Sequence, residues 1–483
     1  MNRRMLCLTL LFSLLAACTP AQPAASPAAA SVTPGPAASA THTPAPSLTP
    51  TQESTITVSD ESLKGLELQL WSPWTGAAAS ELAALVNIFN QSNEWGIRLA
   101  VTAPGGAQVL ESAVRTELDT GGSPPDLTAA PVSVLRSWQN IQPAVTDLQP
   151  YLTDPKWGLA PERIADFNPL FLAQDSDEVM RLGFPAERSA TLLFYNRTWA
   201  KELGFAQAPA SPEEFSKQVC AANQSFRVDT NILNDSLGGW VMDTSADGLL
   251  SWLRVFDWDG LPKTSSDGYT FNNPSALAAL DYLRGLSDQG CIWNGREATS
   301  YNYLANRQAL ITTGTLANLA LQAKTNTRLQ IKDEWVVIPF PGQSQPVLLA
   351  GGPSWAVLAE LPERRLAAWL FIRWMQEPAN QTRFTRATGG FALSQTAADQ
   401  LSAHYASLPQ AGQAQALLPL AQPAPAASTW NSVRPMLSDA GWEALRQYSL
   451  LTSLKLDQPK IVIPTSADIL ANLDATISEV LNR

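Results

Sequence analysis

Apolar and polar residues alternate along positions 66–70, where the chain reads Leu-Glu-Leu-Gln-Leu. This period of two predicts a β-strand with one buried face. From about position 75 to position 93, apolar residues recur at helical spacing, which predicts a helix that buries one side. The apolar residues of that side are Leu82, Leu85, Val86 and Phe89. A strand followed by such a helix is the usual beginning of an α/β fold.

The alternation of strands and helices continues to about position 127 and indicates that this part of the chain forms a parallel sheet. We expect further strands near 97–101, 127, 190–196, 308–313, 335–339 and 356–358. We expect further helices near 108–118, from 198, from 212, and near 247–258, 273–289, 364–376 and from 466. The stretch after 149 and the Ala/Pro/Gln-rich stretch 408–428 are interpreted as connections without regular structure.

The length and the charge of the chain narrow its class. With 483 residues the chain is too long for one hydrophobic core, so at least two lobes are expected. Charged residues make up 16% and the net charge is -11, which argues against a nucleic-acid partner. The 16 tryptophans suit an amphipathic ligand such as a carbohydrate, although Trp is also ordinary core material.

The N-terminal segment has the pattern of a targeting sequence. Arg3 and Arg4 precede a short apolar stretch, and the small residues before Cys18 resemble a bacterial lipobox. Residues 1–17 are therefore interpreted as a lipoprotein signal peptide, with lipidation at Cys18; the alternative is an ordinary signal peptide with an incidental cysteine. Residues 18–58, rich in Ala, Pro, Ser and Thr, are expected to form a disordered stalk.

Two cysteines remain beyond the signal peptide and the lipidation site. Cys220 and Cys291 could form one disulfide outside the cytoplasm, or remain two buried thiols.

Two indoles lie at the end of the first predicted strand. Trp71 and Trp74 follow its last apolar residue, and ligands of open α/β sheets bind beyond the carboxyl ends of strands. At least one of them is a candidate ligand contact, the alternative being that both only pack.

The order of these features along the chain resembles that of the family 1 extracellular solute-binding proteins of ABC importers, the sugar-binding group that includes maltose-binding protein. The stretches that carry the resemblance are Leu70-Trp71, Pro125-Asp126-Leu127, Leu193-Phe194-Tyr195-Asn196, Pro212-Glu213-Glu214-Phe215, Gln308-Ala309-Leu310-Ile311, Trp335-Val336-Val337-Ile338-Pro339 and Ala368-Trp369-Leu370-Phe371-Ile372. The resemblance extends from about Leu63 to the C-terminus.

The resemblance implies a type II periplasmic-binding-protein fold with two α/β lobes and a ligand cleft between them. The N-lobe would comprise 59–186 plus 356–390, and the C-lobe 187–355 plus 391–483. The chain would cross between the lobes near 185–190, near 352–357 and after 390, and the lobes would close by a hinge motion. The implied protein is an extracytoplasmic, monomeric solute receptor that uses no cofactor and no metal. It would deliver a sugar to an ABC permease while its lipid anchor holds it at the membrane.

The resemblance also implies ligand contacts, position by position. They are Trp71, Ser72, Trp74, Thr75, Gly105, Gly106, Ala130, Ser189, Asp243, Asp247, Gly314, Gly352, Trp430, Asn431 and Arg434. Ser189 stands where maltose-binding protein has an acidic contact, and Gly314 where it has a stacking Trp, so maltodextrin itself is disfavoured. Trp430 could replace that aromatic contact. For a phosphorylated ligand, Arg188 and Arg434 are the candidate cations.

Three other classes of function remain open at this point. A glycosidase needs only two carboxylates in a cleft, and Asp243, Asp247 and Asp257 are possible acids. The stretch 257–260 has the alternating acids of a calcium loop but lacks its later ligands. A surface adhesion protein could keep the fold without a transporter. A His-based triad has one candidate outside the stalk, His404, and no nucleophile motif near it.

Overall fold

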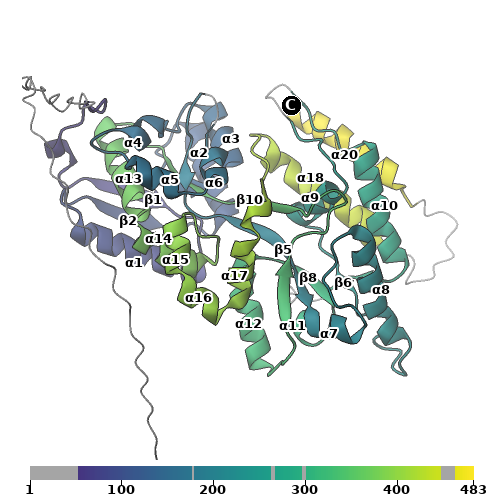
Figure 1. Ribbon diagram of the computed structural model, residues 1–483. Coiled ribbons are helices and arrows are strands. Elements are labelled where there is room, and N and C mark those ends of the chain that lie inside the picture. Colours follow the sequence, from purple (N-terminus) through teal and green to yellow (C-terminus); the bar gives the residue numbers. More distant parts are fainter. Residues whose placement is uncertain (1–52, 177–178, 263–266, 296–300, 448–462, 483) are drawn as a thin grey trace, which may run out of the picture. The chain divides into compact units, whose positions relative to one another are not determined.

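The computed structural model describes residues 53–176, 179–262, 267–295, 301–447 and 463–482 (Figure 1). The predicted signal peptide, Cys18 and most of the predicted stalk lie outside these ranges. Residues 52–483 form one compact unit. Within the described ranges, no helix combines the length and the apolar character that a membrane span requires.

The first sheet has the strand order β2-β1-β3-β11-β4. Its strands are β1 (Glu67–Trp71), β2 (Arg98–Thr102), β3 (Leu127–Ala130), β4 (Phe184–Pro185) and β11 (Ser354–Val357). β1, β2 and β3 are parallel, as the alternation of strands and helices predicts, whereas β11 runs antiparallel to β3 and β4. The helices in the parts of the chain that build this sheet are α1 (Gly76–Ser92), α2 (Ala107–Thr120), α3 (Val132–Ile141), α4 (Gln149–Thr153), α5 (Pro161–Asp166), α6 (Pro169–Gln174), α13 (Pro362–Met375) and α14 (Pro378–Thr388).

The second sheet has the order β12-β10-β5-β8-β6-β7, with β9 paired to β5. Its strands are β5 (Ser189–Asn196), β6 (Trp240–Val241), β7 (Ile292–Trp293), β8 (Ile311–Thr315), β9 (Trp335–Ile338), β10 (Leu348–Gly351) and β12 (Ala421–Pro423). β5 is antiparallel to β8, β9 and β10, whereas β6 is parallel to β7 and β8, so this sheet is mixed. The accompanying helices are α7 (Arg197–Glu202), α8 (Pro212–Arg227), α9 (Ala246–Val255), α10 (Pro274–Asp288), α11 (Tyr301–Ala305), α12 (Leu319–Arg328), α17 (Pro409–Ala416), α18 (Trp430–Trp442) and α20 (Ser466–Leu481), with α15 (Gln395–Gln400) and α16 (Ser402–Ser407) before α17.

The chain passes from one sheet to the other at 186–188, between β4 and β5, and at 352–353, between β10 and β11. The two crossings are bonded to each other, because the Glu187 N–H donates to the Pro353 carbonyl at 3.1 Å. A third segment follows α14, where the Phe391 N–H donates to the Arg188 carbonyl at 2.7 Å. We call the part of the molecule around the first sheet the first lobe and the part around the second sheet the second lobe.

The two lobes share one hydrophobic core beside these crossings. The largest buried cluster contains Leu68 and Phe89 of the first lobe together with Phe194 and Trp335 of the second. A separate cluster fills the second lobe around Trp240 and Trp252. The shared core restricts relative motion of the lobes to rotations that keep it packed.

Two stretches expected to lack regular structure contain helices. The stretch after 149 carries α4, α5 and α6, and the stretch 408–428 carries α17 and β12. Each of these four helices has a proline at its N1 or N2 position, where the missing N–H costs nothing. Composition alone therefore misled the interpretation, since these prolines begin helices.

Candidate functional site

Three hydrogen bonds join α3 of the first lobe to residues 426–431 of the second. The Ser133 hydroxyl donates to Asn431 Oδ1 at 3.3 Å. Arg136 Nη1 donates to the Ala426 carbonyl at 3.1 Å, and Asn140 Nδ2 donates to Ser428 Oγ at 3.1 Å. Asn431, one of the predicted ligand contacts, therefore lies where the two lobes meet.

A charged group lies next to this contact. Arg434, one helical turn after Asn431 in α18, forms an ion pair with Asp247 of α9 at 2.8 Å. Both side chains are nearly half exposed, at 43% and 49%, so the pair remains open to solvent or a ligand. Glu111 of α2 in the first lobe interacts electrostatically with Arg434. Burial raises the pKa of Glu111, and the Arg434 charge partly opposes that rise. The guanidinium thus attracts carboxylates from both lobes.

Asp243 sits just before α9 and faces the start of that helix. Its Oδ1 accepts from the Ser245 N–H at 2.9 Å. Burial is the main cause that raises the pKa of Asp243, and the nearby Asp247 charge raises it further. Ser245 caps α9, because its side chain accepts from the Gly248 N–H. Asp247 lies in the first turn without being the cap, which leaves its carboxylate for Arg434.

Another group of predicted contacts lies at the crossings. Trp74 Nε1 donates to Glu187 Oε2 at 2.6 Å, and burial raises the pKa of Glu187 while this bond opposes the rise. Ser189 begins β5, and its buried hydroxyl has no hydrogen-bond partner in the structure. Gly352 has φ 153° and packs so closely that a Cβ would lie 2.5 Å from the Glu187 carbonyl. The glycine is therefore required by the crossing itself.

Residues 71–75, at the end of β1 and in the loop after it, differ in their exposure. Trp71 ends β1 and is half-buried, whereas Ser72 is 1% exposed and Trp74 7% exposed. Trp74 packs against Trp355 and Phe384, with ring centroids 5.1 and 4.9 Å apart. The structure thus uses most of the Trp74 indole for packing.

Three further predicted contacts lie at the neighbouring strand end. Thr75 is exposed at the beginning of α1, and Gly105 and Gly106 have φ 130° and 103° just before α2. A Cβ on Gly106 would lie 4.0 Å from Thr75 Cγ2, so the two loops meet.

Three further predicted contacts are Ala130, Gly314 and Trp430. Ala130 is 1% exposed at the end of β3. Gly314 lies in β8, and a Cβ there would be 2.8 Å from Phe194 Cζ. Trp430 is 4% exposed and packs 6.1 Å from Tyr269. Arg188, the candidate cation for a phosphate, is fully buried in an ion pair with Asp175 at 2.7 Å. Ala130, Trp430 and Arg188 therefore offer a ligand little or no surface.

Sequence reasoning missed three side chains that the structure places at the meeting of the lobes. They are Glu111, Ser133 and Glu187. Glu187 could have been found, because it lies within the predicted crossing two residues before Ser189. Glu111 and Ser133 lie on helical faces whose partners are distant in the sequence, and no local pattern identifies them.

The arrangement suits binding through hydrogen bonds and charge. Within the described residues, no three His, Cys, Asp or Glu side chains come together as a metal site would require. Of the acids in the calcium-like stretch, Asp257 accepts from the Ser344 hydroxyl at 2.7 Å and Asp259 pairs with Arg254 at 3.2 Å. Both therefore have protein partners.

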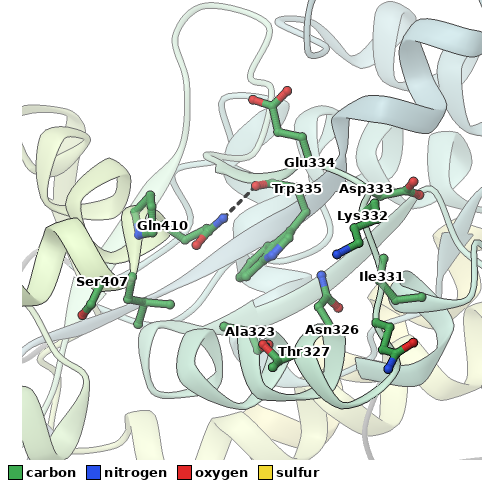
Figure 2. Close-up of a pocket in the computed structure, with 13 residues that line it drawn as sticks. Ala323, Asn326, Thr327, Ile331, Lys332, Asp333, Glu334, Trp335, Ser407 and Gln410 are labelled. Carbon is green, nitrogen blue, oxygen red and sulfur yellow. Dashed lines mark hydrogen bonds between the residues drawn. The ribbon is translucent and has the colours of Figure 1, made fainter. Parts of the chain in front are cut away.

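A large cavity lies outside all of these groups. It has a volume of about 770 Å³ and is bounded by α12, residues 330–335 and the junction of α16 and α17 (Figure 2). None of the predicted ligand contacts lines it.

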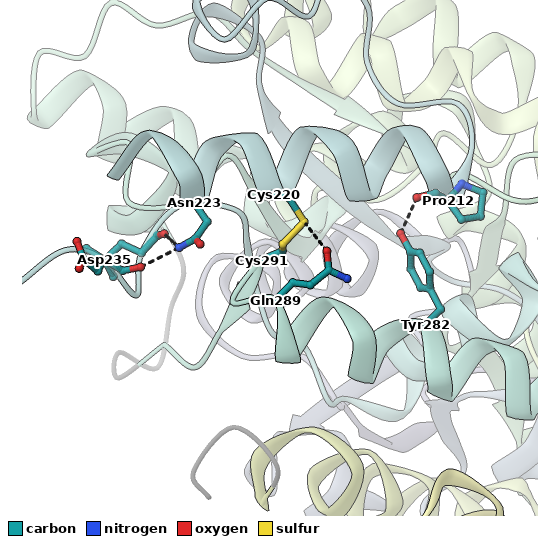
Figure 3. Close-up of a disulfide and its surroundings, with 8 residues drawn as sticks. Pro212, Cys220, Asn223, Asp235, Tyr282, Gln289 and Cys291 are labelled. Carbon is teal, nitrogen blue, oxygen red and sulfur yellow. Dashed lines mark hydrogen bonds between the residues drawn. A yellow bond between two sulfur atoms is a disulfide. The ribbon is translucent and has the colours of Figure 1, made fainter. Parts of the chain in front are cut away.

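The structure joins Cys220 and Cys291 in a disulfide (Figure 3). The bond links α8 to the residue before β7, and the two Cα atoms are 4.5 Å apart. Nearby, the Tyr282 hydroxyl of α10 donates to the Pro212 carbonyl of α8 at 2.7 Å. In this structure the two cysteines are therefore paired, and the alternative of two unpaired thiols does not apply.

The sequence of residues 84–431 matches the family model described as bacterial extracellular solute-binding protein. No curated protein matches the chain. Among solved structures, the chain is similar to the cyclic α-maltosyl-1,6-maltose binding protein from Arthrobacter globiformis, at 17% identity over 86% of this chain and 99% of that one, with a TM-score of 0.66. It is also similar to the sugar-binding protein MalE from Xanthomonas citri, at 18% identity over 86% and 97%, with a TM-score of 0.67. UgpB from Mycobacterium tuberculosis, solved with glycerophosphocholine, matches at 18% identity over 86% and 98%, with a TM-score of 0.65. These structures share the two-lobed fold.

Proposed function

Because this chain belongs to the bacterial extracellular solute-binding protein family, we propose that it is the receptor of an ABC importer. It binds a carbohydrate between its lobes and passes it to a membrane permease. Proteins of similar structure bind maltose-type sugars, and one binds glycerophosphocholine. Each is a binding protein, and the proposed role here is likewise capture without chemistry.

The observation that carries this proposal is the polar meeting of the lobes at α3 and α18. Asn431 is bonded to Ser133 across it, and Arg434 with Asp247 lies one turn further along α18. Carboxylate, amide, hydroxyl and guanidinium groups together can donate to and accept from several sugar hydroxyls. Trp71 is half-buried at the end of β1, and we propose that its indole ring stacks on the apolar face of the sugar.

The proposal includes the arrangement expected from the sequence. The lobes, 59–186 plus 356–390 and 187–355 plus 391–483, close by rotation about the crossings. A lipid at Cys18 and the part of the stalk 18–58 that precedes Ser54 hold the monomer at the outer side of the membrane. Ser54 itself belongs to the folded unit, because its hydroxyl donates to Asp154 Oδ2 at 2.8 Å. The site residues that we propose to touch ligand are Trp71, Ser189, Asp247, Asn431 and Arg434.

Calorimetry and thermal unfolding of the full chain against glucose, maltose, trehalose and glycerophosphocholine test the proposal. At a thousandfold excess over the dissociation constant, a ligand stabilises the protein by about 4 kcal/mol. We expect one sugar to shift the unfolding temperature and to remain intact on chromatography.

Matched variants then locate the site. Arg434→Ala should weaken sugar binding about tenfold or more, because it removes a charged donor. Arg115→Ala, in an exposed pair with Asp119, should leave the binding unchanged. Sugar cleavage would instead support a glycosidase, and equal loss of binding in both variants would contradict the site.

A further inference from the structure

The cavity of about 770 Å³ shown in Figure 2 has the dimensions of a ligand site. Small-molecule pockets in proteins have volumes of roughly 300–1,000 Å³. Its walls come from α12, from residues 330–335, and from residues 407–410 between α16 and α17. It shares no lining residue with the meeting of the lobes, so a ligand there would occupy a separate site.

The interior of this cavity combines an aromatic ring with amide and hydroxyl groups. The indole of Trp335, 6% exposed, and the carboxamide of Asn326 lie next to each other in its wall, with Trp335 Nε1 3.2 Å from the Asn326 amide (Figure 2). Gln410 donates through Nε2 to the Trp335 carbonyl at 2.9 Å, which fixes the side chain and leaves its Oε1 as an acceptor. Gln330 and Ser407 add further polar groups at the edge. Such groups can bind the hydroxyls of a ligand.

The two carboxylates that line the cavity are neutralised by other parts of the protein. Asp333 binds the Arg307 guanidinium at 2.7 Å, and that guanidinium also binds Glu202. Glu334 pairs with Arg197 at 2.8 Å and with Lys201 at 3.5 Å. Three cations thus balance three anions at this edge, namely Arg197, Lys201 and Arg307 against Glu202, Asp333 and Glu334.

Lys332 is the charge that remains. It lines the cavity, and its ammonium group is turned toward Asn326 (Figure 2). It has no ion pair with any residue that the structure describes. Lys324 and Arg328 lie eight and four residues before Lys332, and both are exposed. Neither has an ion pair with a residue that the structure describes. The mouth of the cavity is therefore locally positive in a chain of net charge -11.

We propose that this cavity is a second ligand site, which binds a small anion carrying hydroxyl groups: a carboxylate or a phosphate on a polyol body. Lys332 binds the anionic group, since an ammonium presents three donors and a full charge. Gln330, Gln410 and Ser407 bind the hydroxyls. The site does not depend on what the lobes bind between them.

Calorimetric titration of the full chain with gluconate, glucose 6-phosphate and sorbitol tests this proposal. Sorbitol is the neutral control, because it has the polyol body without the anion. We expect saturable binding of gluconate or glucose 6-phosphate, and at least tenfold weaker binding of sorbitol. Which of the two anions binds more tightly identifies the anionic group.

Three variants assign the binding to the cavity. Lys332→Ala should weaken anion binding about tenfold or more, and Thr327→Trp should also weaken it, because a bulky ring in the wall takes up part of the cavity. Lys324→Ala removes the same charge outside the cavity and should change the affinity less than twofold. Circular dichroism checks that each exposed substitution leaves the fold intact.

Several results would overturn the proposal. They are no saturable binding of either anion, equal losses in Lys332→Ala and Lys324→Ala, and sorbitol binding as tight as that of the anions. Loss of binding in Arg434→Ala with full binding in Lys332→Ala would place the anion between the lobes. That last outcome would refute the second site without affecting the proposed receptor function.

Discussion

The ion pair between Asp175 and Arg188 holds both crossings together and allows a quantitative prediction. Arg188 Nη2 lies 2.8 and 2.7 Å from the two Asp175 oxygens. The Ser354 hydroxyl, on the second crossing, donates to Asp175 Oδ1 at 2.6 Å. Arg188 Nη1 also donates to the Pro353 carbonyl at 3.0 Å. Asp175 follows α6, so one carboxylate connects three segments of the chain.

The expected effect of Asp175→Asn follows from burial. The side chains of Arg188 and Asp175 are 0% and 1% exposed, so neither charge is solvated by water. Removing one partner of a buried pair leaves an uncompensated charge and costs about 3–5 kcal/mol. Besides Asp175, the hydrogen-bond acceptors of Arg188 are backbone carbonyls and the Ser354 hydroxyl, which carry no negative charge to replace that of Asp175. We therefore expect Asp175→Asn to lower the free energy of unfolding by about 3–5 kcal/mol.

Urea denaturation followed by tryptophan fluorescence measures this change. The matched control is Asp119→Asn, whose partner Arg115 is 3.4 Å away with side chains 48% and 63% exposed. That exposed pair should contribute at most about 1 kcal/mol. The double variant Asp175→Leu/Arg188→Met should recover most of the loss, because it removes both charges. If Asp175→Asn lowers the free energy of unfolding no more than Asp119→Asn does, then the Asp175–Arg188 pair does not stabilise the crossings.

Other measurements test different parts of the structure. Cys220→Ser should lower the free energy of unfolding by about 4 kcal/mol, since the disulfide spans 71 residues, and dithiothreitol should produce the same loss in the wild type but none in the variant. Burial raises the pKa of Glu187, so the folded protein binds this proton more tightly than the unfolded chain, and stability rises as pH falls through the interval between the two pKa values. Glu187→Gln should remove that pH dependence, and identical pH profiles for the two proteins would refute it. Trp430→Ala should cost about 3–5 kcal/mol of stability, because the indole is 4% exposed; sugar affinity lost at unchanged stability would show that the indole is a ligand contact instead.

Local patterns along the sequence determined most of the elements correctly. The alternation at 66–70 and the helical spacing from 75 to 93 correspond to β1 and α1. The helices predicted at 273–289 and from 466 correspond to α10 and α20. These strands and helices depend on neighbours within a few residues, so the sequence shows them directly. The crossings near 185–190 and 352–357 were implied by the family resemblance instead, and these ranges contain the passages between the sheets.

The tertiary structure decided which side chains are available to a ligand. Trp74 and Trp71 are three residues apart in one loop, yet only Trp74 is enclosed by Trp355 and Phe384. From the sequence, Arg188 and Arg434 were equal candidates for binding a phosphorylated ligand. In the structure Arg188 is buried in its ion pair with Asp175, whereas Arg434 remains nearly half exposed. Whether a side chain is exposed, and whether its charge is paired, depends on residues that can lie hundreds of positions away in the sequence. The unpaired charge of Lys332 at the cavity is another feature that only the tertiary structure shows. Local periodicity carries no information about such partners, because it reports only which face of an element is buried and not what buries it.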